Sequence, residues 1–403
     1  MSIRVSQPAI NLREKLTETG TPPIGAHGSE LMNSSSAGES FDLVKAGRKN
    51  MIINGDMQIA QRATSKASLA NGWTIDTVDR WNWARNNAGT WTVSQDSDVP
   101  IGQGFTKSFK AACTTADAAV DPGDYLLLEQ TIEANRMAHI GWGTTGAKPV
   151  TLSFWVKSSV VGDCSSTLYC NGFNTTRLIN QIFTIHNANE WEFKTMSFPA
   201  HGPENSFTID NEIGARLWIW FKGGSSYTAG AGTRNYWRNN TANQQAAGHT
   251  INLASSTSNN VWITGVQLEA GYNATPFDYK SYADQLHDCM RYYYKLHNAD
   301  GDQLRFVGYG GGGTSAGFSL IHKPPMRDTP TGLLTVSSGN FSYNDGIAAY
   351  SGNNGGGGWS FSGNRFSCDV NTTTNAANTA IRSKALSIYS GGSGTTIELF
   401  AEM

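Results

Sequence analysis

The segment Val150–Ser158 alternates apolar and polar side chains, which is the period of a β-strand with one buried face. Leu152, Phe154 and Val156 fall on the apolar side, opposite two hydroxyl residues, a tryptophan and a lysine. About ten such short segments between Gly- and Pro-rich joints predict a β-sandwich over residues 51–280. The other expected strands are Met51–Ile53, Met57–Ile59, Thr74–Val78, Arg80–Arg85, Thr90–Ser94, Tyr125–Thr131, Ile182–Ile185, Glu190–Phe198, Arg216–Phe221 and Val261–Leu268.

Composition agrees with a β-rich fold. Charged residues make up 15% of the chain, against about 25% in an average protein, and 44 of the 403 residues are glycine. These values disfavour helical bundles, and the 11% of aromatic residues argues against disorder. The net charge is −2 without a Lys/Arg block, so no nucleic-acid partner is expected.

Targeting and redox signals are few. No apolar segment approaches the roughly 20 residues that cross a bilayer, so membrane insertion is not expected. Met1–Val5 does not begin a signal peptide, which predicts synthesis in a cytoplasm. The five cysteines are expected to be reduced and buried, with a Cys164–Cys170 disulfide as the alternative.

Residues 1–50 and 281–403 differ from the predicted sandwich. The first region contains two short capped helices that are too small for a core of their own. It is therefore either a flexible terminus or an anchor to a larger assembly, through the apolar residues Leu12, Leu16, Phe41 and Leu43. The last region begins with a helix over Ser281–Cys289 and a strand over Met290–Leu296, and continues as a smaller Gly-rich β domain.

The sequence contains no recognisable catalytic or metal-binding motif. Glu190 and Glu192 would share a strand face roughly 7 Å apart, which fits a hydrolase pair as well as a solvated face. Asp76 and Asp79 around Arg80 are interpreted as a structural ion pair. We therefore predict no enzymatic activity, no catalytic residue and no metal site.

Aromatic residues are the more informative signal. Trp81 and Trp83 are interpreted as core, and either the Trp218/Trp220 face or its opposite must point outward or into a partner. The polar loop over residues 225–243 combines aromatic rings with planar polar side chains, as sugar recognition requires. It would bind glycan, pack against a neighbouring subunit, or lie in solvent. The candidate glycan-binding residues are Tyr227, Arg234, Tyr236, Trp237, Arg238 and Asn239.

Several motifs in order resemble tail-fibre and other receptor-binding virion proteins of tailed bacteriophages, especially marine podophage-like ones. Val78–Trp81 is similar to their Asp-Arg-Trp element, and Leu152–Ser158 to their central strand. The remaining similar segments are Pro8–Gly20, Asn50–Arg62, Ile263–Phe277, Ser281–Lys295 and Pro324–Thr331. Their central module also resembles the carbohydrate-binding jelly rolls of polysaccharide hydrolases. In that module Asp79 and Arg80 would order a turn, and Gln267 and Glu269 would bond backbone.

This resemblance implies a mainly β protein: a jelly-roll β-sandwich at 51–280, a smaller Gly-rich β domain at 281–403 and a short helical anchor at 1–50. It implies a homotrimeric tail fibre of the virion that binds bacterial surface polysaccharide during host adsorption and contacts other tail or neck proteins through its N-terminus. The alternatives are a capsid- or neck-mounted fibre or decoration protein, and a glycan depolymerase. The C-terminal domain is a rival receptor site. No cofactor is expected; some related modules hold a structural calcium ion, which no acidic cluster in this sequence locates.

Overall fold

The computed structural model divides the chain into two units, residues 1–49 and 50–403. The described residues are 50–297, 305–310, 315–321, 324–335, 340–344, 349–353, 360–363, 367–373, 385–390 and 396–402. Leu12, Leu16, Phe41 and Leu43 lie outside these ranges, so the anchoring role of residues 1–50 stays a prediction. None of the described helices is long and apolar enough to cross a membrane.

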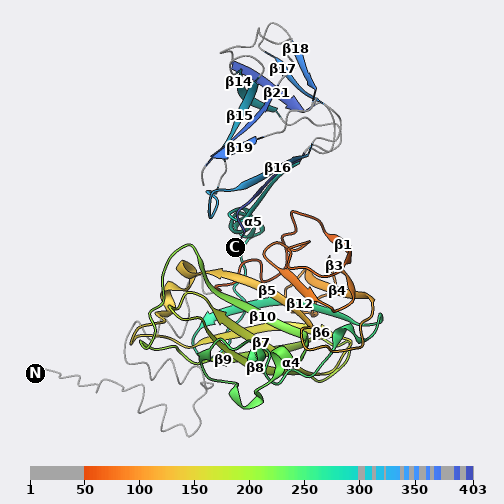
Figure 1. The fold of residues 1–403 in the computed structure, drawn as a ribbon, viewed down its shortest axis with the longest axis vertical. Coiled ribbons are helices and arrows are strands. Elements are labelled where there is room, and N and C mark those ends of the chain that lie inside the picture. The colour runs from red at the N-terminus through yellow and green to blue at the C-terminus, as the bar shows by residue number, and fades with distance from the viewer. Residues whose placement is uncertain are drawn as a thin grey trace, which may run out of the picture. The chain divides into compact units, whose positions relative to one another are not determined.

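Two six-stranded antiparallel sheets form the first part of this second unit (Figure 1). In sheet A the spatial order is β1 (Ser65–Leu69), β3 (Thr90–Asp96), β4 (Ser108–Thr115), β12 (Asn260–Ala270), β6 (Val150–Ser158) and β9 (Glu192–Phe198). In sheet B it is β11 (Arg238–Asn239), β8 (Arg177–Ile185), β7 (Gly162–Cys170), β10 (Ile213–Gly223), β5 (Tyr125–Glu133) and β2 (Asn82–Asn86). Neighbours such as β4 and β12 are far apart in the chain, as in a jelly roll. The predicted mainly β, jelly-roll fold class is confirmed.

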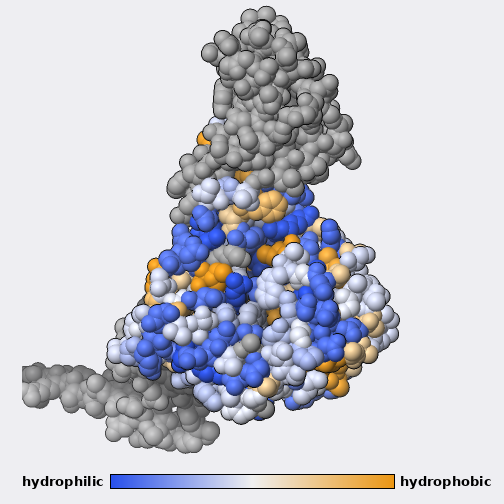
Figure 2. Space-filling view, in the orientation of Figure 1, coloured by the Kyte–Doolittle hydropathy of each residue, from blue (hydrophilic) through white to orange (hydrophobic). Residues whose placement is uncertain are grey.

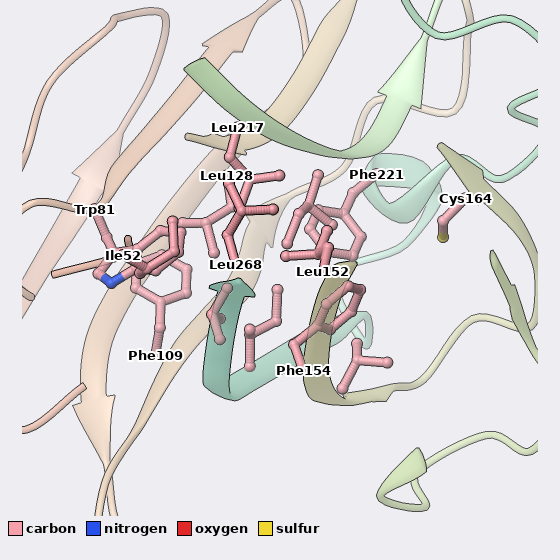
Figure 3. Close-up of a cluster of buried hydrophobic side chains, with 14 of the residues drawn as sticks. Ile52, Trp81, Phe109, Leu128, Leu152, Phe154, Cys164, Leu217, Phe221 and Leu268 are labelled. Atoms are coloured by element: carbon pink, nitrogen blue, oxygen red, sulfur yellow. The ribbon is translucent and has the colours of Figure 1, made fainter. Parts of the chain in front are cut away.

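The core lies between the two sheets. Leu152 and Phe154 of β6 meet Leu217 and Phe221 of β10, and none of the four is exposed (Figure 3). Trp81 and Trp83 are buried in the same cluster, which confirms their interpretation as core. Cys113, Cys164, Cys170 and Cys289 are buried free thiols, so the preferred reduced state is confirmed for these four. Outside the core, the face of the sandwich seen in Figure 2 is mostly hydrophilic, with small separate hydrophobic patches.

Three of the expected strands are not strands in the structure. Met51–Ile59 is a largely buried irregular segment with turns. Its Ile53 N–H donates to the side-chain oxygen of Gln130 and its carbonyl accepts from the side-chain nitrogen, at 2.8 Å each, so a side chain takes the place of a strand partner. Thr74–Val78 is irregular because polar side chains compete for it: the Thr74 hydroxyl bonds Asp76, which in turn faces Arg85 at 3.7 Å.

The chain after the sandwich begins with helix α5 (Tyr282–Met290), whose cap Ser281 accepts a 3.2 Å bond from the Asp284 N–H as predicted. A three-stranded sheet follows, in the order β13 (Tyr293–His297), β22 (Thr396–Phe400) and β16 (Thr331–Thr335). A seven-stranded sheet contains β18 (Ala349–Asn353), β17 (Asn340–Asn344), β21 (Ala385–Ser390), β14 (Arg305–Gly310), β15 (Ser315–Ile321), β20 (Ser367–Thr373) and β19 (Ser360–Gly363), in that order. The C-terminal region is thus β-structured, whereas the predicted boundary at residue 280 stays a prediction.

Candidate functional site

Strand β10 places two tryptophans on the outer face of sheet B. Its residues alternate, so Leu217 and Ile219 enter the core while Trp218 and Trp220 face away from it. Trp220 is covered by the loop that follows β10, where Tyr227 packs on it at 5.4 Å between ring centroids. Trp218 is nearer the N-terminal end of β10 than Trp220, away from the loop that contains Tyr227.

Four rings from separate segments make a continuous strip around Trp218, which we call the aromatic strip. Tyr169 of β7 stacks on Trp218 at 4.7 Å between ring centroids and 28° between ring planes. Trp73 approaches Trp218 edge-on at 6.4 Å, and Tyr125 approaches Trp73 at 5.7 Å. Trp73 is 43% exposed, so its ring gives the strip an accessible end.

The carboxylate of Glu129 on β5 holds the two indoles in place. Its oxygens accept hydrogen bonds from Nε1 of Trp218 at 2.6 Å and from Nε1 of Trp73 at 3.2 Å. Arg216 adds a third donor at 3.2 Å. Burial raises the pKa of Glu129, and Arg216 and the two indoles oppose that rise. Both tryptophan rings are therefore oriented before any ligand arrives.

A pocket of about 260 Å³ opens beside Trp73. This volume is slightly below the range of about 300–1,000 Å³ for drug-sized ligands, so it suits a group of monosaccharide size. The floor comes from sheet B, and one wall comes from the segment that follows β22. The lining residues are Arg62, Trp73, Thr74, Ile75, Arg80, Asn82, Glu129, Thr131, Phe400 and Glu402.

Three polar atoms of the lining residues have no hydrogen-bond partner among the described residues: Arg62 Nη1, Arg80 Nε and Asn82 Oδ1. All three are buried, and an unpaired buried polar atom costs about 1–3 kcal/mol. Native proteins contain few of them, and each calls for a water or ligand partner. All three atoms belong to residues that line the pocket, so we take the pocket as the candidate site.

Arg80 connects the pocket to the C-terminal part of the chain. Its φ of 73° is left-handed, a conformation that residues with a side chain rarely adopt outside functional or tightly constrained sites. The guanidinium bonds the backbone carbonyl of Thr131 at 2.9 Å, pairs with Glu402, and lies 3.6 Å from the ring centroid of Tyr292. Glu402 is also bonded by Arg62, at 3.1 Å.

The predicted loop residues do not form one platform. Tyr227 faces Trp220, whereas Trp237 packs against Trp142 at 5.1 Å and donates from Nε1 to the Pro199 carbonyl at 2.8 Å. Of the six residues, Tyr236 and Asn239 are exposed, and Arg234 and Arg238 are partly or fully buried.

Arg238 holds the loop together and is not available at its surface. Its guanidinium donates to the Thr233 and Gln244 carbonyls and to Asn180 Oδ1, at 2.6–2.7 Å. Burial lowers the pKa of Arg238 to about 10. As a candidate sugar ligand it is therefore corrected to a structural residue.

Two carboxylate predictions are corrected. Glu190 precedes β9 and is exposed, whereas Glu192 accepts the His186 and Asn187 N–H groups and pairs with Lys194 at 2.5 Å, so the two do not share a strand face. Arg80 pairs with Glu402 and not with the neighbouring aspartates.

Those two aspartates have other arginine partners. Asp76 faces Arg85 at 3.7 Å, and Asp79 faces Arg62 at 3.8 Å. By contrast, Gln267 and Glu269 do bond backbone, since they accept the Asp278 and Thr275 N–H groups at 2.8 Å. Over the described part of the chain, no group of three or more His, Cys, Asp or Glu side chains could hold a metal ion.

Comparisons with known proteins find similar chain arrangements only among solved structures; no family model and no curated protein matches the sequence. One similar structure is the enzymatically active domain of tailspike protein 4 of bacteriophage CBA120, with 13% identity and a TM-score of 0.26 over 55% of this chain and 21% of that one. A xylan-binding domain from Paenibacillus barcinonensis is 12% identical, with a TM-score of 0.26 over 54% and 96% of the two chains.

A further similar structure is a family 11 carbohydrate-binding module from Clostridium thermocellum, solved with a mixed-linked tetrasaccharide. It is 10% identical, with a TM-score of 0.26 over 53% of this chain and 99% of that one. At this level of similarity, only the residues of the present chain can support a statement about its function.

Proposed function

We propose that this chain binds glycan in the pocket beside Trp73, with the aromatic strip as its extension. The supporting observation is the 43% exposed indole of Trp73 beside a pocket that is also lined by arginine, asparagine, threonine and glutamate residues. A sugar offers an apolar C–H face to a ring, and hydroxyl groups that both donate and accept. An exposed indole beside a lining that contains both hydrogen-bond donors and acceptors matches that chemistry.

In this proposal the protein is a virion tail fibre that binds host surface polysaccharide during adsorption, without hydrolysing it. The ordered motifs from Asn50 to Thr331, which resemble those of phage receptor-binding proteins, support the virion role. The chain is a homotrimer, since Gly-rich strands gain stability from neighbouring subunits, and residues 1–50 dock on tail or neck proteins. A monomer by light scattering at micromolar concentration would contradict the trimer.

The binding experiment uses the full chain and capsular or lipopolysaccharide glycan from the host, measured by calorimetry. We expect Trp73→Ala to cost on the order of 1–3 kcal/mol of affinity, the magnitude of aromatic–base stacking. Tyr272→Ala is the matched control, because Tyr272 is an aromatic residue that is 65% exposed outside this pocket. Equal losses in the two variants would contradict a site at Trp73.

The exposed loop residue Tyr236 provides the test of the rival location. If Tyr236→Ala abolishes binding while Trp73→Ala retains it, recognition belongs to the loop over residues 225–243. If neither variant changes adsorption while removal of residues 297–403 does, it belongs to the C-terminal domain.

Two further assays address the alternatives. Reducing-end release from the bound polysaccharide would establish a depolymerase, and a density map of the virion would separate a tail fibre from a capsid- or neck-mounted protein.

A further inference from the structure

We infer that the outer face of sheet A carries a second carbohydrate site, in a pocket beside Trp155 and Phe193 that takes an uncharged sugar. Because the two sheets enclose the core between them, this face lies opposite the face of sheet B that carries Trp73. The inference rests on the proposed function for the class of ligand, and it adds a separate site with its own chemistry.

Two groups of aromatic rings line this pocket, which has a volume of about 250 Å³. Trp155 of β6 follows the core residue Phe154 and therefore points outward, where its ring lies 5.2 Å from that of Phe193 on β9. The second group has ring centroids 5.0–5.5 Å apart and consists of Phe105, Phe277 and Tyr279. Phe193 is 47% exposed and Tyr279 is 49% exposed, so each group presents ring surface that a ligand can reach.

Two glycines seat the second group against the backbone. Gly265 has a φ of 65° and lies where the register of β12 with β6 shifts. A Cβ on Gly265 would lie 2.5 Å from Cζ of Phe105, and one on Gly104, whose φ is 81°, would lie 2.8 Å from the hydroxyl of Tyr279. The rings are therefore held in place before a ligand arrives, which lowers the cost of binding.

The lining of this pocket has no charged side chain. It consists of five aromatic residues, one glycine, one proline and three uncharged polar residues, which are Gln103, Ser153 and Thr275. Burial and the nearby Asp56 raise the pKa of Tyr279, so its phenol is neutral as well. By contrast, two arginines and two glutamates line the Trp73 pocket. A ligand carboxylate or ammonium would lose hydration here without gaining a counter-charge.

The polar groups at the rings both donate and accept, as sugar hydroxyls require. Gln103 is exposed, and its side-chain amide has no partner among the described residues. The Tyr279 hydroxyl donates to the Gln103 carbonyl and keeps its oxygen as an acceptor. A peptide could not add as a strand over this pocket, because β6 and β12 each have strand partners on both sides. A sugar ring, with an apolar C–H face and neutral hydroxyls, fits these groups.

The test uses the full chain with Trp73→Ala, so that the first site does not contribute. Neutral oligosaccharides of dextran, mannan and galactan are titrated by calorimetry beside acidic ones of polygalacturonate and alginate. We expect at least one neutral oligosaccharide to bind, and added Phe193→Ala to weaken it about tenfold or more, the effect of one lost stacking contact. Tyr282→Ala is the matched control, since Tyr282 is 59% exposed on α5, outside both pockets, and should leave affinity within about twofold.

Gln103→Ala is a second variant, which removes an exposed amide and should weaken the same ligand at an unchanged melting temperature. Absence of Phe193-dependent binding to every neutral oligosaccharide would overturn the inference, as would equal or tighter Phe193-dependent binding of the acidic ones. A change in molar mass on Phe193→Ala, seen by light scattering, would assign this face to a subunit contact instead. The proposed function fails on a different result: equal binding of host polysaccharide by Trp73→Ala and the natural protein.

Discussion

The indole Nε1 of Trp218 on β10 donates a 2.6 Å hydrogen bond to Oε2 of Glu129 on the adjacent strand β5. Trp73 donates to the other carboxylate oxygen, so one buried side chain orients two aromatic rings from different segments. The chemistry of the strip is thus fixed by a residue that presents little surface of its own.

Glu129→Gln should disturb this arrangement. The amide has one acceptor oxygen in place of two, which leaves an indole or Arg216 without a partner. We expect a loss of about 1–3 kcal/mol in the free energy of unfolding, measured by urea denaturation with tryptophan fluorescence. Glu204→Gln is the control, because that side chain is 70% exposed, and it should change stability by less than about 0.5 kcal/mol. Equal effects would show that Glu129 does not hold the rings.

Trp237→Ala should affect stability more than binding. The ring packs against Trp142 and Phe173, and Nε1 bonds the Pro199 carbonyl. Removing a large side chain from such a site costs about 2–4 kcal/mol when it is partly exposed. Calorimetric melting measures the loss, with the neighbouring Tyr236→Ala as a control near zero. Weakened glycan binding at unchanged stability would instead favour the loop as the site.

Glu402 should stabilise the fold more than its exposure suggests. Its side chain is 20% exposed, as is that of Glu398, but Glu402 pairs with the fully buried Arg80, whereas Glu398 pairs with the partly exposed Lys295. Breaking a buried pair costs about 3–5 kcal/mol, against about 0–1 for a surface pair. We therefore expect Glu402→Ala to lower the free energy of unfolding by several times as much as Glu398→Ala. Similar losses would mean that Arg80 does not depend on Glu402.

Asp79 should make stability fall with rising pH over one interval. Burial raises its pKa to about 6, against the opposing effect of Arg62 and Gln61. Between about pH 4 and 6 the folded protein keeps a proton that the unfolded chain has lost, so the contribution of Asp79 decreases as pH rises and is constant above. Two pKa units correspond to roughly 3 kcal/mol. The difference in unfolding free energy between the natural protein and Asp79→Asn, followed across pH, should show this slope; a rising difference would contradict it.

His249 should act in the opposite direction. Burial lowers its pKa to about 4, and it is held neutral, donating from Nε2 to the Ile251 carbonyl at 2.8 Å and accepting the Ser165 N–H at Nδ1. Acidification from about pH 6.5 to 4 protonates the unfolded chain first, so stability is lost as pH falls. His249→Gln should remove this acid sensitivity while Asp79→Asn leaves it in place. Identical acid profiles for the natural protein and His249→Gln would rule out His249 as its source.

Sequence patterns predicted the features that depend on neighbouring residues, such as the two faces of a strand and the start of a helix. The alternation in β10 placed Trp218 and Trp220 on the face opposite Leu217 and Ile219, and Ser281 marked the start of α5. The same patterns could not identify Trp73 as a site residue. It lies in an irregular segment held beside β2 by two 3.0 Å backbone bonds between Gly72 and Arg85, with no periodicity to mark it.

Pairings between distant segments explain the other errors. Asp76, Asp79 and Arg80 are close in sequence, which predicts that they neutralise one another, but each pairs with a residue elsewhere. The partner of Arg80 is 322 residues away, at Glu402. This pair forms only because the chain returns from the seven-stranded sheet to β22, next to β13. The alternation of residues within one strand does not encode that return.

That separation has a consequence for biosynthesis. Arg62 and Glu402, both in the pocket, are bonded across 340 residues of chain. When a ribosome has translated the whole sandwich, it has still to translate Phe400 and Glu402, which form one wall of the pocket. A chain whose translation stops before β22 therefore lacks this wall of the pocket and the partner of the buried Arg80.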